Sequence, residues 1–457
     1  MDKGPAVSPF EIKNIRRFIM FRLFFNARFY YPVFSILFLD FGLTLSQFAI
    51  LNAVWAATIV LCEVPSGALA DTIGRRKLLV FAGALMGVEM VLFASAPRGN
   101  PVLLFAFLLV NRILSGTAEA CASGADEALA FDALKREGDV ALWGRVLEVQ
   151  MRVQAAGFII VMLVGGAVYD VALVQRASDL LGLGIVVTRD TTLRFPIYLS
   201  LVMAVFAFLT ALKMTDTARE NCPENADCSK TILSGFRLTL QTARWIVKTP
   251  FVFIVILTGF VFDSVVRMVI TMASQYYRLI QIPEAFFGII GSSVALMGFF
   301  IPRLARRQTE RHTPLFNLGL MAGLVFIGLI GMRFFFPFFG LLPGLVLFSN
   351  MFFLNFFLSH YLNRAAGSDQ RATVLSFKGL ALNLGYGFIG ILYSLLLTFL
   401  RSQEQALHPE ISGDALKNVV FVVSMGWFPG YLAVGLVVLL LFAGWKLRKT
   451  KEYGLIT

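Results

Sequence analysis

Residues 67–77 read GALADTIGRRK and separate two long apolar runs, Phe48 to Ala70 and Leu78 to Ala96. Each run is close to the roughly 20 apolar residues that a membrane-spanning helix needs. The stretch between them is therefore expected to be a short loop joining two membrane helices. Gly74 supplies a sharp turn that a side chain would resist. The bases that follow it favour the cytoplasmic side of the membrane.

The composition extends this interpretation to the whole chain of 457 residues, of which 58% are hydrophobic and only 15% are charged. We count about twelve apolar runs long enough to cross a bilayer. The formal net charge of +12 lies mostly in the short loops between these runs, so the bases indicate membrane orientation and not nucleic-acid binding.

The longest polar stretch divides the apolar runs into two groups of six. We therefore predict an all-α polytopic membrane protein with twelve transmembrane helices in two pseudo-symmetric six-helix bundles. The predicted parts are an N-terminal bundle at 1–214, a cytoplasmic linker at 215–249, and a C-terminal bundle with a cytoplasmic tail at 250–457. Clusters of bases recur on alternate loops, which predicts an even number of crossings and both termini in the cytoplasm.

The expected fourth helix, Val102 to near Leu129, carries charges inside an apolar run. Residues seven apart lie on nearly the same helical face, so Arg112, Glu119 and Asp126 form one stripe with Ser115 beside it. Ionisable groups inside a membrane are by default functional, and we expect a pathway for substrate and protons with Glu119 as its protonatable acid. The alternative is a fixed Arg112–Glu119 ion pair that only holds helices together.

Two motifs resemble those of the major facilitator superfamily. The stretch GALADTIGRRK is similar to the loop motif G-x-L-a-D-r-x-G-r-[kr], and Arg112 to Gly116 are similar to R-x-x-q-G on the fourth helix, with Ser115 in place of glutamine. The resemblance implies the twelve-helix fold of that family and secondary transport by alternating access. An internal repeat at Gly298, Pro302 and Arg306 fits two equivalent halves, as expected of transporters.

The resemblance also implies a conformational latch at the inner side of the first half. In it, Arg75 pairs with Asp126, or with Glu127 in the same role, and Asp71 is directed toward the N-terminus of the eleventh helix. Gly67 is expected to allow two helices to approach closely. The latch residues that we assign from the sequence are Gly67, Asp71, Gly74, Arg75, Arg76, Asp126, Glu127, Arg145 and Glu148.

The second half has its own polar candidates. Asp263 and Arg267 are four apart in the seventh expected helix and hence adjacent, which fits either a binding element or a neutralised structural pair. Asn355 and Asn383 lie on the tenth and eleventh expected helices and are further candidates for the pathway. Several arginines within apolar runs favour an anionic or zwitterionic substrate.

These features predict a secondary active transporter, monomeric and multi-pass, that moves a small organic solute across the cytoplasmic membrane by symport or antiport with protons. The chain has no Walker loop and no cluster of His and Cys with metal spacing, so we expect no enzyme activity, cofactor, metal or nucleic-acid partner. The alternatives are an efflux pump for lipophilic compounds and, from another class, a solute receptor or lipid scramblase without coupled transport.

Overall fold

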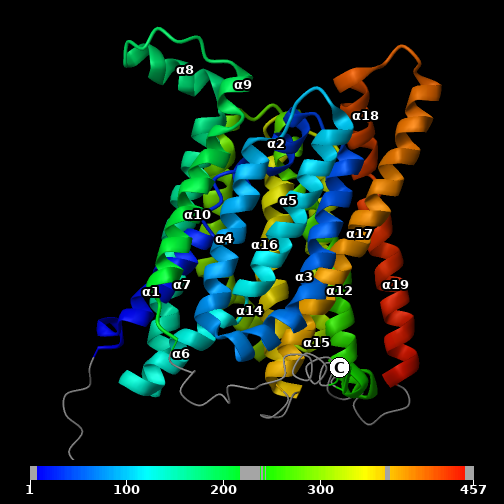
Figure 1. Cartoon of the computed structure of the whole chain (residues 1–457). Coiled ribbons are helices and arrows are strands. Elements are labelled where there is room, and N and C mark those ends of the chain that lie inside the picture. Colours follow the sequence, from blue (N-terminus) through cyan, green and yellow to red (C-terminus); the bar gives the residue numbers. More distant parts are fainter. Residues whose placement is uncertain (1–7, 217–236, 238–239, 242, 366–370, 448–457) are drawn as a thin grey trace, which may run out of the picture. The chain divides into compact units, whose positions relative to one another are not determined.

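The computed structural model describes residues 8–216, 237, 240–241, 243–365 and 371–447. The regular elements in these residues are helical throughout (Figure 1). Part of the expected linker at 215–249 falls outside them, as does most of the tail. Contacts divide the chain into two compact units. Unit 1 comprises Met1–Val33 and Ala57–Arg237, and unit 2 comprises Phe34–Ala56 and Leu238–Thr457.

The helices of unit 1 are η1 (Pro9–Glu11), α1 (Lys13–Phe25), η2 (Tyr31–Val33), α4 (Arg75–Ala94), α5 (Pro101–Ala122), α6 (Ala125–Glu137), η3 (Val140–Leu142), α7 (Trp143–Tyr169), α8 (Val171–Leu180), α9 (Arg189–Thr192) and α10 (Phe195–Lys213). The division between the units falls within α3 (Leu45–Ile73). The helices of unit 2 are α2 (Phe34–Phe41), α12 (Pro250–Thr271), α13 (Ala273–Leu279), η5 (Glu284–Phe286), α14 (Phe287–Arg311), α15 (Pro314–Met332), α16 (Leu341–Ala365), α17 (Arg371–Leu407), α18 (Gly413–Met425) and α19 (Phe428–Leu447).

Eleven helical segments of the described residues are long and apolar enough to cross a membrane. The first expected helix, Phe18 to Asp40, is absent from this set because it is not continuous. It consists of α1 and the η2–α2 segment, with irregular backbone at residues 26–30. Counting these two pieces as one interrupted span brings the total to the twelve that the sequence predicts.

The interruption of the first span has a local cause. Pro32 has no backbone N–H and restricts the residue before it, and Arg28 needs a charged partner if it is to be buried. Irregular backbone at membrane depth must find partners within the protein. The Phe29 N–H donates to Ser200 Oγ at 2.9 Å. A Cβ at Gly165 would collide with the Phe29 carbonyl oxygen, so only glycine lets α7 pass this close.

The fourth and twelfth spans are also interrupted, where the sequence predicted continuous helices. Between α5 and α6 the chain turns at Gly124, whose φ of 76° suits glycine. Between α18 and α19 lie Gly426 and Trp427, and Pro429 in the first turn of α19 has no N–H to continue the helical ladder.

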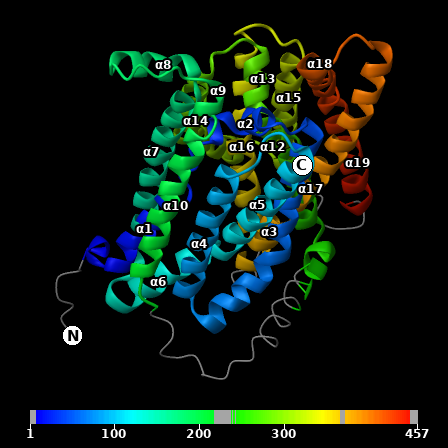
Figure 2. The ribbon, with the colours of Figure 1, turned by 45° about the horizontal axis from the view of Figure 1, so that its top comes forward.

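Within unit 1, α4 packs between α5 and α10, while α1 contacts α6, α7 and α10 (Figure 1). A Cβ added to Gly83 would lie 2.9 Å from the Phe208 backbone, so α4 and α10 approach as closely as glycine permits. Figure 2 shows α8 lying nearly across the direction of α10.

Within unit 2, α12 is central and contacts α16, α17 and α19, and α16 in turn packs against α14 and α15. Glycines allow these contacts too. A Cβ at Gly259 would lie 2.7 Å from Leu358, and one at Gly435 would lie 2.9 Å from Val261. Small residues at helix crossings replace the hydrophobic driving force that is missing within a bilayer.

Candidate functional site

A buried ion pair lies where the first span of unit 1 is interrupted. Arg28, in the break, pairs with Glu89 of α4, and their side chains are only 4% and 0% exposed. Arg28 Nη1 also donates to Tyr30 Oη at 3.4 Å, and Asn111 Nδ2 of α5 donates to the Glu89 carbonyl at 2.7 Å. Because the backbone is irregular here, Arg28 lies beside α4 and α5 and not in a continuous helix. We call Arg28, Tyr30, Glu89, Arg112 and Glu119 the unit 1 cluster.

The α5 members of this cluster are those expected from the sequence. Arg112 and Ser115 are buried, Glu119 is half-buried, and Arg28 is near enough to Glu119 to interact electrostatically. The Glu119 side chain makes no hydrogen bond or ion pair with the residues that the structure describes, so the alternative of a fixed Arg112–Glu119 pair is not present there. The expected stripe is shorter than predicted, because α5 ends before Asp126, which lies on α6 beyond the turn at Gly124.

Unit 2 contains a second buried cluster, centred on α12. Arg267 Nη2 lies 2.7 Å from Asp263 Oδ2, and Arg267 Nη1 donates to Asn383 Oδ1 of α17 at 2.9 Å. The guanidinium lies 5.3 Å from the centre of the Tyr386 ring, and Lys378 interacts electrostatically with Asp263. We call Asp263, Arg267, Lys378, Asn383 and Tyr386 the unit 2 cluster.

Asn355, which the sequence assigns to the pathway, does not join this cluster. Its side chain is exposed on α16 and forms no hydrogen bond with a described residue. Lys378 lies on the eleventh expected helix, where the sequence indicates only a further polar contact, and Tyr386 is the member that the sequence analysis did not assign. Tyr386 lies three residues after Asn383 on α17, and this helical spacing is the signal that could have found it.

The predicted inner latch has different partners in the structure. Arg75 pairs with Asp132, and not with Asp126. Asp126 accepts from Arg22 Nε at 2.6 Å, and Glu127 lies 2.8 Å from Arg22 Nη2. The turn at Gly124 accounts for the difference, because it ends the helical register that placed Asp126 beside Arg112.

The turn itself is as predicted. Gly74 has a φ of 100°, which disfavours other residues. The N–H of Arg76, two residues after Gly74, donates to Asp216 Oδ2 at 3.3 Å, so a carboxylate lies at the start of α4. Arg76 Nη2 donates to the Leu212 carbonyl at 2.8 Å. The side chain of Asp71 lies outside the described part of the chain.

Three other assigned latch residues take no part in the Arg75 pair. A Cβ at Gly67 would meet nothing within 4 Å, so the close helix approach expected there is absent from this structure. Glu148 pairs with Arg152 at 2.6 Å on the same exposed face of α7. Arg145 lies 5.9 Å from the centre of the Phe10 ring.

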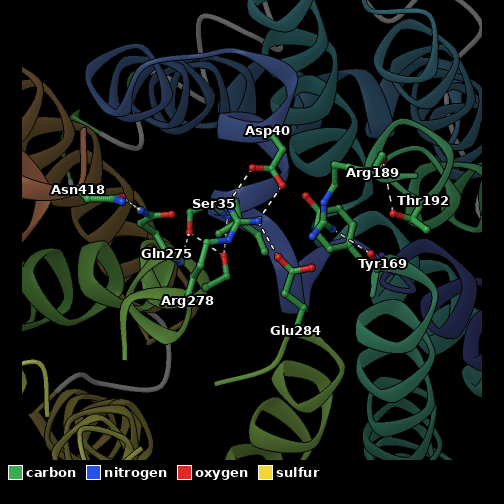
Figure 3. Close-up of polar contacts among 11 residues, drawn as sticks. Ser35, Asp40, Tyr169, Arg189, Thr192, Gln275, Arg278, Glu284 and Asn418 are labelled. Atoms are coloured by element: carbon green, nitrogen blue, oxygen red, sulfur yellow. Dashed lines mark hydrogen bonds and ion pairs between the residues drawn. The ribbon is translucent and has the colours of Figure 1, made fainter. Parts of the chain in front are cut away.

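A further polar network in unit 2 was not foreseen from the sequence (Figure 3). Arg278 of α13 binds both carboxylate oxygens of Asp40 of α2 at 2.8 Å and Glu284 Oε1 at 2.8 Å. Burial lowers the pKa of Arg278, but the two carboxylates outweigh it and raise that pKa overall, so the arginine stays charged. Ser35 Oγ and Ser274 Oγ are 2.7 Å apart in the same network.

The network lies within unit 2 and includes residues of the segment 34–56, which the sequence places in the first bundle. Its members are far apart in the chain, and the sequence analysis assigns no role to Asp40. Apolar patterning does not reveal such partners. We call Ser35, Asp40, Ser274, Arg278 and Glu284 the α2–α13 network.

Eleven candidate spans among the described residues, an interrupted first span and charges buried within the helices are typical of a polytopic membrane transporter. Residues 18–390 match the profile of the Major Facilitator Superfamily, and the chain belongs to this family. It is a transporter and not an enzyme.

Solved structures of transporters share the fold. A bacterial homologue of the human lysosomal transporter Spinster superposes with a TM-score of 0.70 at 13% identity, over 97% of this chain and 99% of that one. The nucleoside transporter NupG gives 0.65 at 13% identity, over 97% and 99%. A D-xylose–proton symporter gives 0.59 at 14% identity, over 93% and 97%. No curated protein sequence matches the chain.

Proposed function

We propose that this protein is a secondary active transporter that moves a small organic solute across the cytoplasmic membrane by alternating access, driven by the proton gradient. In the proposed topology both termini are cytoplasmic and the functional unit is a monomer. Membership of the family supports the function of a transporter. The proton coupling and the solute class are inferred from the two buried clusters.

The proposed proton coupling rests on Glu119, whose side chain is not held in an ion pair with a described residue. A coupling carboxylate must bind and release a proton during the cycle, which a carboxylate held in a tight ion pair does poorly. Glu89 is held by Arg28, and Asp263 by Arg267. Glu119 has no such bond to a described residue, yet lies within the electrostatic reach of Arg28. Among the acids of the two clusters, it is the one best placed to exchange a proton.

The solute class follows from the chemistry that each unit offers. Each cluster holds a carboxylate beside a guanidinium, and Arg112 and Lys378 add further positive charge. Arginine binds planar carboxylates in a bidentate manner, and a buried carboxylate favours an ammonium group. A zwitterionic solute could exchange partners with the Asp263–Arg267 pair, and an anionic one could bind the arginines alone.

The α2–α13 network supports alternating access. It contains an arginine bound to two carboxylates, and within unit 2 it holds residues 34–56, which the sequence assigns to the first bundle, to α13. Transport by rocking of two repeats requires contacts that form in one state and are released in the other. We propose that these bonds are among those released during the cycle.

The test begins with a thermal-shift screen of zwitterionic and anionic metabolites against the purified protein, because bound ligand raises the unfolding temperature. The solute found is then used in proteoliposomes. Glu119→Gln should retain counterflow, which needs no proton, and lose accumulation driven by a pH gradient.

The matched control is Glu63→Gln, which removes another partly buried acid, from α3. It should leave both activities intact. Unchanged accumulation by Glu119→Gln would refute proton transfer at this residue. A solute that binds but shows no counterflow would favour the receptor alternative, and binding only of uncharged lipophilic compounds would favour an efflux pump.

A further inference from the structure

A cavity of about 840 Å³ lies within unit 2, among α17, α18, α19 and the end of α15. Its lining is largely apolar and includes Leu392, Val422 and Val434. Figure 2 shows α17, α18 and α19 next to one another. Val434 is 65% exposed and Trp427 is 54% exposed, so the cavity opens on the surface of membrane-spanning helices. Its volume falls in the range of small-molecule pockets.

The interruption of the twelfth span makes this cavity. Gly426 and Trp427 separate α18 from α19, and Pro429 cannot donate to the backbone of the preceding turn. Irregular backbone at membrane depth is tolerated where it lines a cavity or is buried in protein. Inside the cavity, Tyr393 Oη is fixed at 2.8 Å from Ser424 Oγ, which holds α17 beside α18.

One charged side chain lines the cavity. Arg333 follows the last residue of α15, and its Nε would lie 3.4 Å from a Cβ on Gly426. The Arg333 side chain is exposed and forms no hydrogen bond or ion pair with a described residue. The position of Arg333 at the C-terminus of α15 is favourable, because a cation there interacts with the helix dipole. The helix dipole does not explain why an apolar cavity lies beside Arg333.

The neighbours of Arg333 indicate its depth in the bilayer. Trp427 and Tyr431 line the same cavity, and these residue types concentrate at the level of the lipid headgroups. An arginine at that level meets phosphate, which it binds in a bidentate manner. Hydrocarbon chains of the surrounding bilayer are the molecules that contact the apolar part of the cavity.

We propose that this cavity is a specific binding site for an anionic phospholipid, with an acyl chain along α17 and α19 and the phosphate on Arg333. The site is separate from the two buried clusters and does not depend on the proposed solute or proton coupling. We call it the α17–α19 lipid site.

The structure offers a matched pair of variants to test the apolar part. Gly430 lines the cavity, and a Cβ there would meet nothing within 4 Å, so Gly430→Leu introduces an apolar side chain at a position that is open at its Cβ. Gly444 lies on the same helix outside the cavity, and a Cβ there is equally free. Gly444→Leu is therefore the control.

The full chain is reconstituted in nanodiscs with a phosphatidylglycerol that carries a photoreactive diazirine near the end of one acyl chain. Labelled peptides are mapped by mass spectrometry. We expect adducts on residues 389–434 in the wild type and in Gly444→Leu, and at least about tenfold fewer in Gly430→Leu, since the chain is excluded. Equal labelling of the two glycine variants, or adducts elsewhere only, would overturn the proposal.

The phosphate part has its own test. Loss of a charge-assisted hydrogen bond should lower phosphatidylglycerol retention about tenfold in Arg333→Ala, measured by native mass spectrometry. Arg401→Ala removes another exposed arginine, outside the cavity, and should retain the lipid. A diacylglycerol with the same diazirine should label wild type and Arg333→Ala alike. Equal retention by both arginine variants would overturn the assignment of Arg333 to the phosphate.

Discussion

The two buried clusters are built in different ways. In unit 1, Arg28 and Glu89 are 61 residues apart, and their pair joins the break in the first span to α4. In unit 2, Asp263 and Arg267 are one turn apart on α12, and Arg267 also bonds to Asn383 of α17. The Arg28–Glu89 pair depends on tertiary packing. The Asp263–Arg267 pair depends only on helical spacing within α12.

This difference has an energetic consequence. Both Arg28 and Glu89 are almost fully buried, so neither can be hydrated if its partner is lost. Asp263 is also buried, but Arg267 remains 26% exposed and keeps two further contacts, with Asn383 and Tyr386. We infer that the unit 1 pair is mainly structural, while the unit 2 pair can change partners at lower cost.

The largest effect is expected from breaking the unit 1 pair. Arg28→Met leaves Glu89 buried without its charged partner, which should cost about 3–5 kcal/mol of unfolding free energy. Chemical unfolding of the purified protein in detergent measures it. Arg152→Met is the control, because the Glu148–Arg152 pair is exposed and should be worth less than about 1 kcal/mol.

A double variant separates the pair from the individual charges. Arg28→Met with Glu89→Leu removes both charges and should recover much of the stability that Arg28→Met loses, as apolar replacements of buried ion pairs often do. A double variant as unstable as the single one would contradict the interpretation of Glu89 as an uncompensated charge.

A smaller loss is expected in unit 2. Asp263→Asn leaves Arg267 partly hydrated and bonded to Asn383, so the unfolding free energy should fall by about 1–3 kcal/mol. The same unfolding measurement applies. A loss as large as that of Arg28→Met would remove the distinction between the two clusters.

The smallest effect concerns the pairing of Arg75. Its side chain and that of Asp132 are 23% and 32% exposed, so a double-mutant cycle with Arg75→Ala and Asp132→Ala should give a coupling of about 1 kcal/mol or less. The cycle of Arg75 with Asp126 should give none. The opposite result would restore the partner that the sequence predicts.

The sequence predicts the spans well because apolar length is a local property. Apolar length alone predicts the fifth helix at Leu142–Tyr169 and the sixth at Phe195–Lys213. The structure has α7 at Trp143–Tyr169 and α10 at Phe195–Lys213. Interruptions at Asn26 to Tyr30 and at Gly124 were missed, since apolar residues on both sides keep the average hydrophobicity high. Arg28, Pro32 and Gly124 were the available signals.

Partners across the chain are harder to predict. Periodicity places Arg267 beside Asp263 because both lie on one helix, but it contains no information on the Arg28–Glu89 pair or on Arg278 and Asp40. The Arg75–Asp126 pair is implied by the resemblance and not by periodicity, and the structure has Asp132 in place of Asp126. Periodicity places Asp126 in one stripe with Arg112 and Glu119, but that helical register does not continue through the turn at Gly124.

Alternating access is tested most directly by one crosslink. Ser35→Cys and Ser274→Cys are introduced after replacement of the four native cysteines, at positions whose hydroxyl oxygens are 2.7 Å apart. A disulfide there would hold α2 to α13. We predict that oxidation abolishes solute counterflow in proteoliposomes and that reduction restores it, while either single-cysteine variant is unaffected. Counterflow that continues at full rate in the fully crosslinked protein would contradict the account.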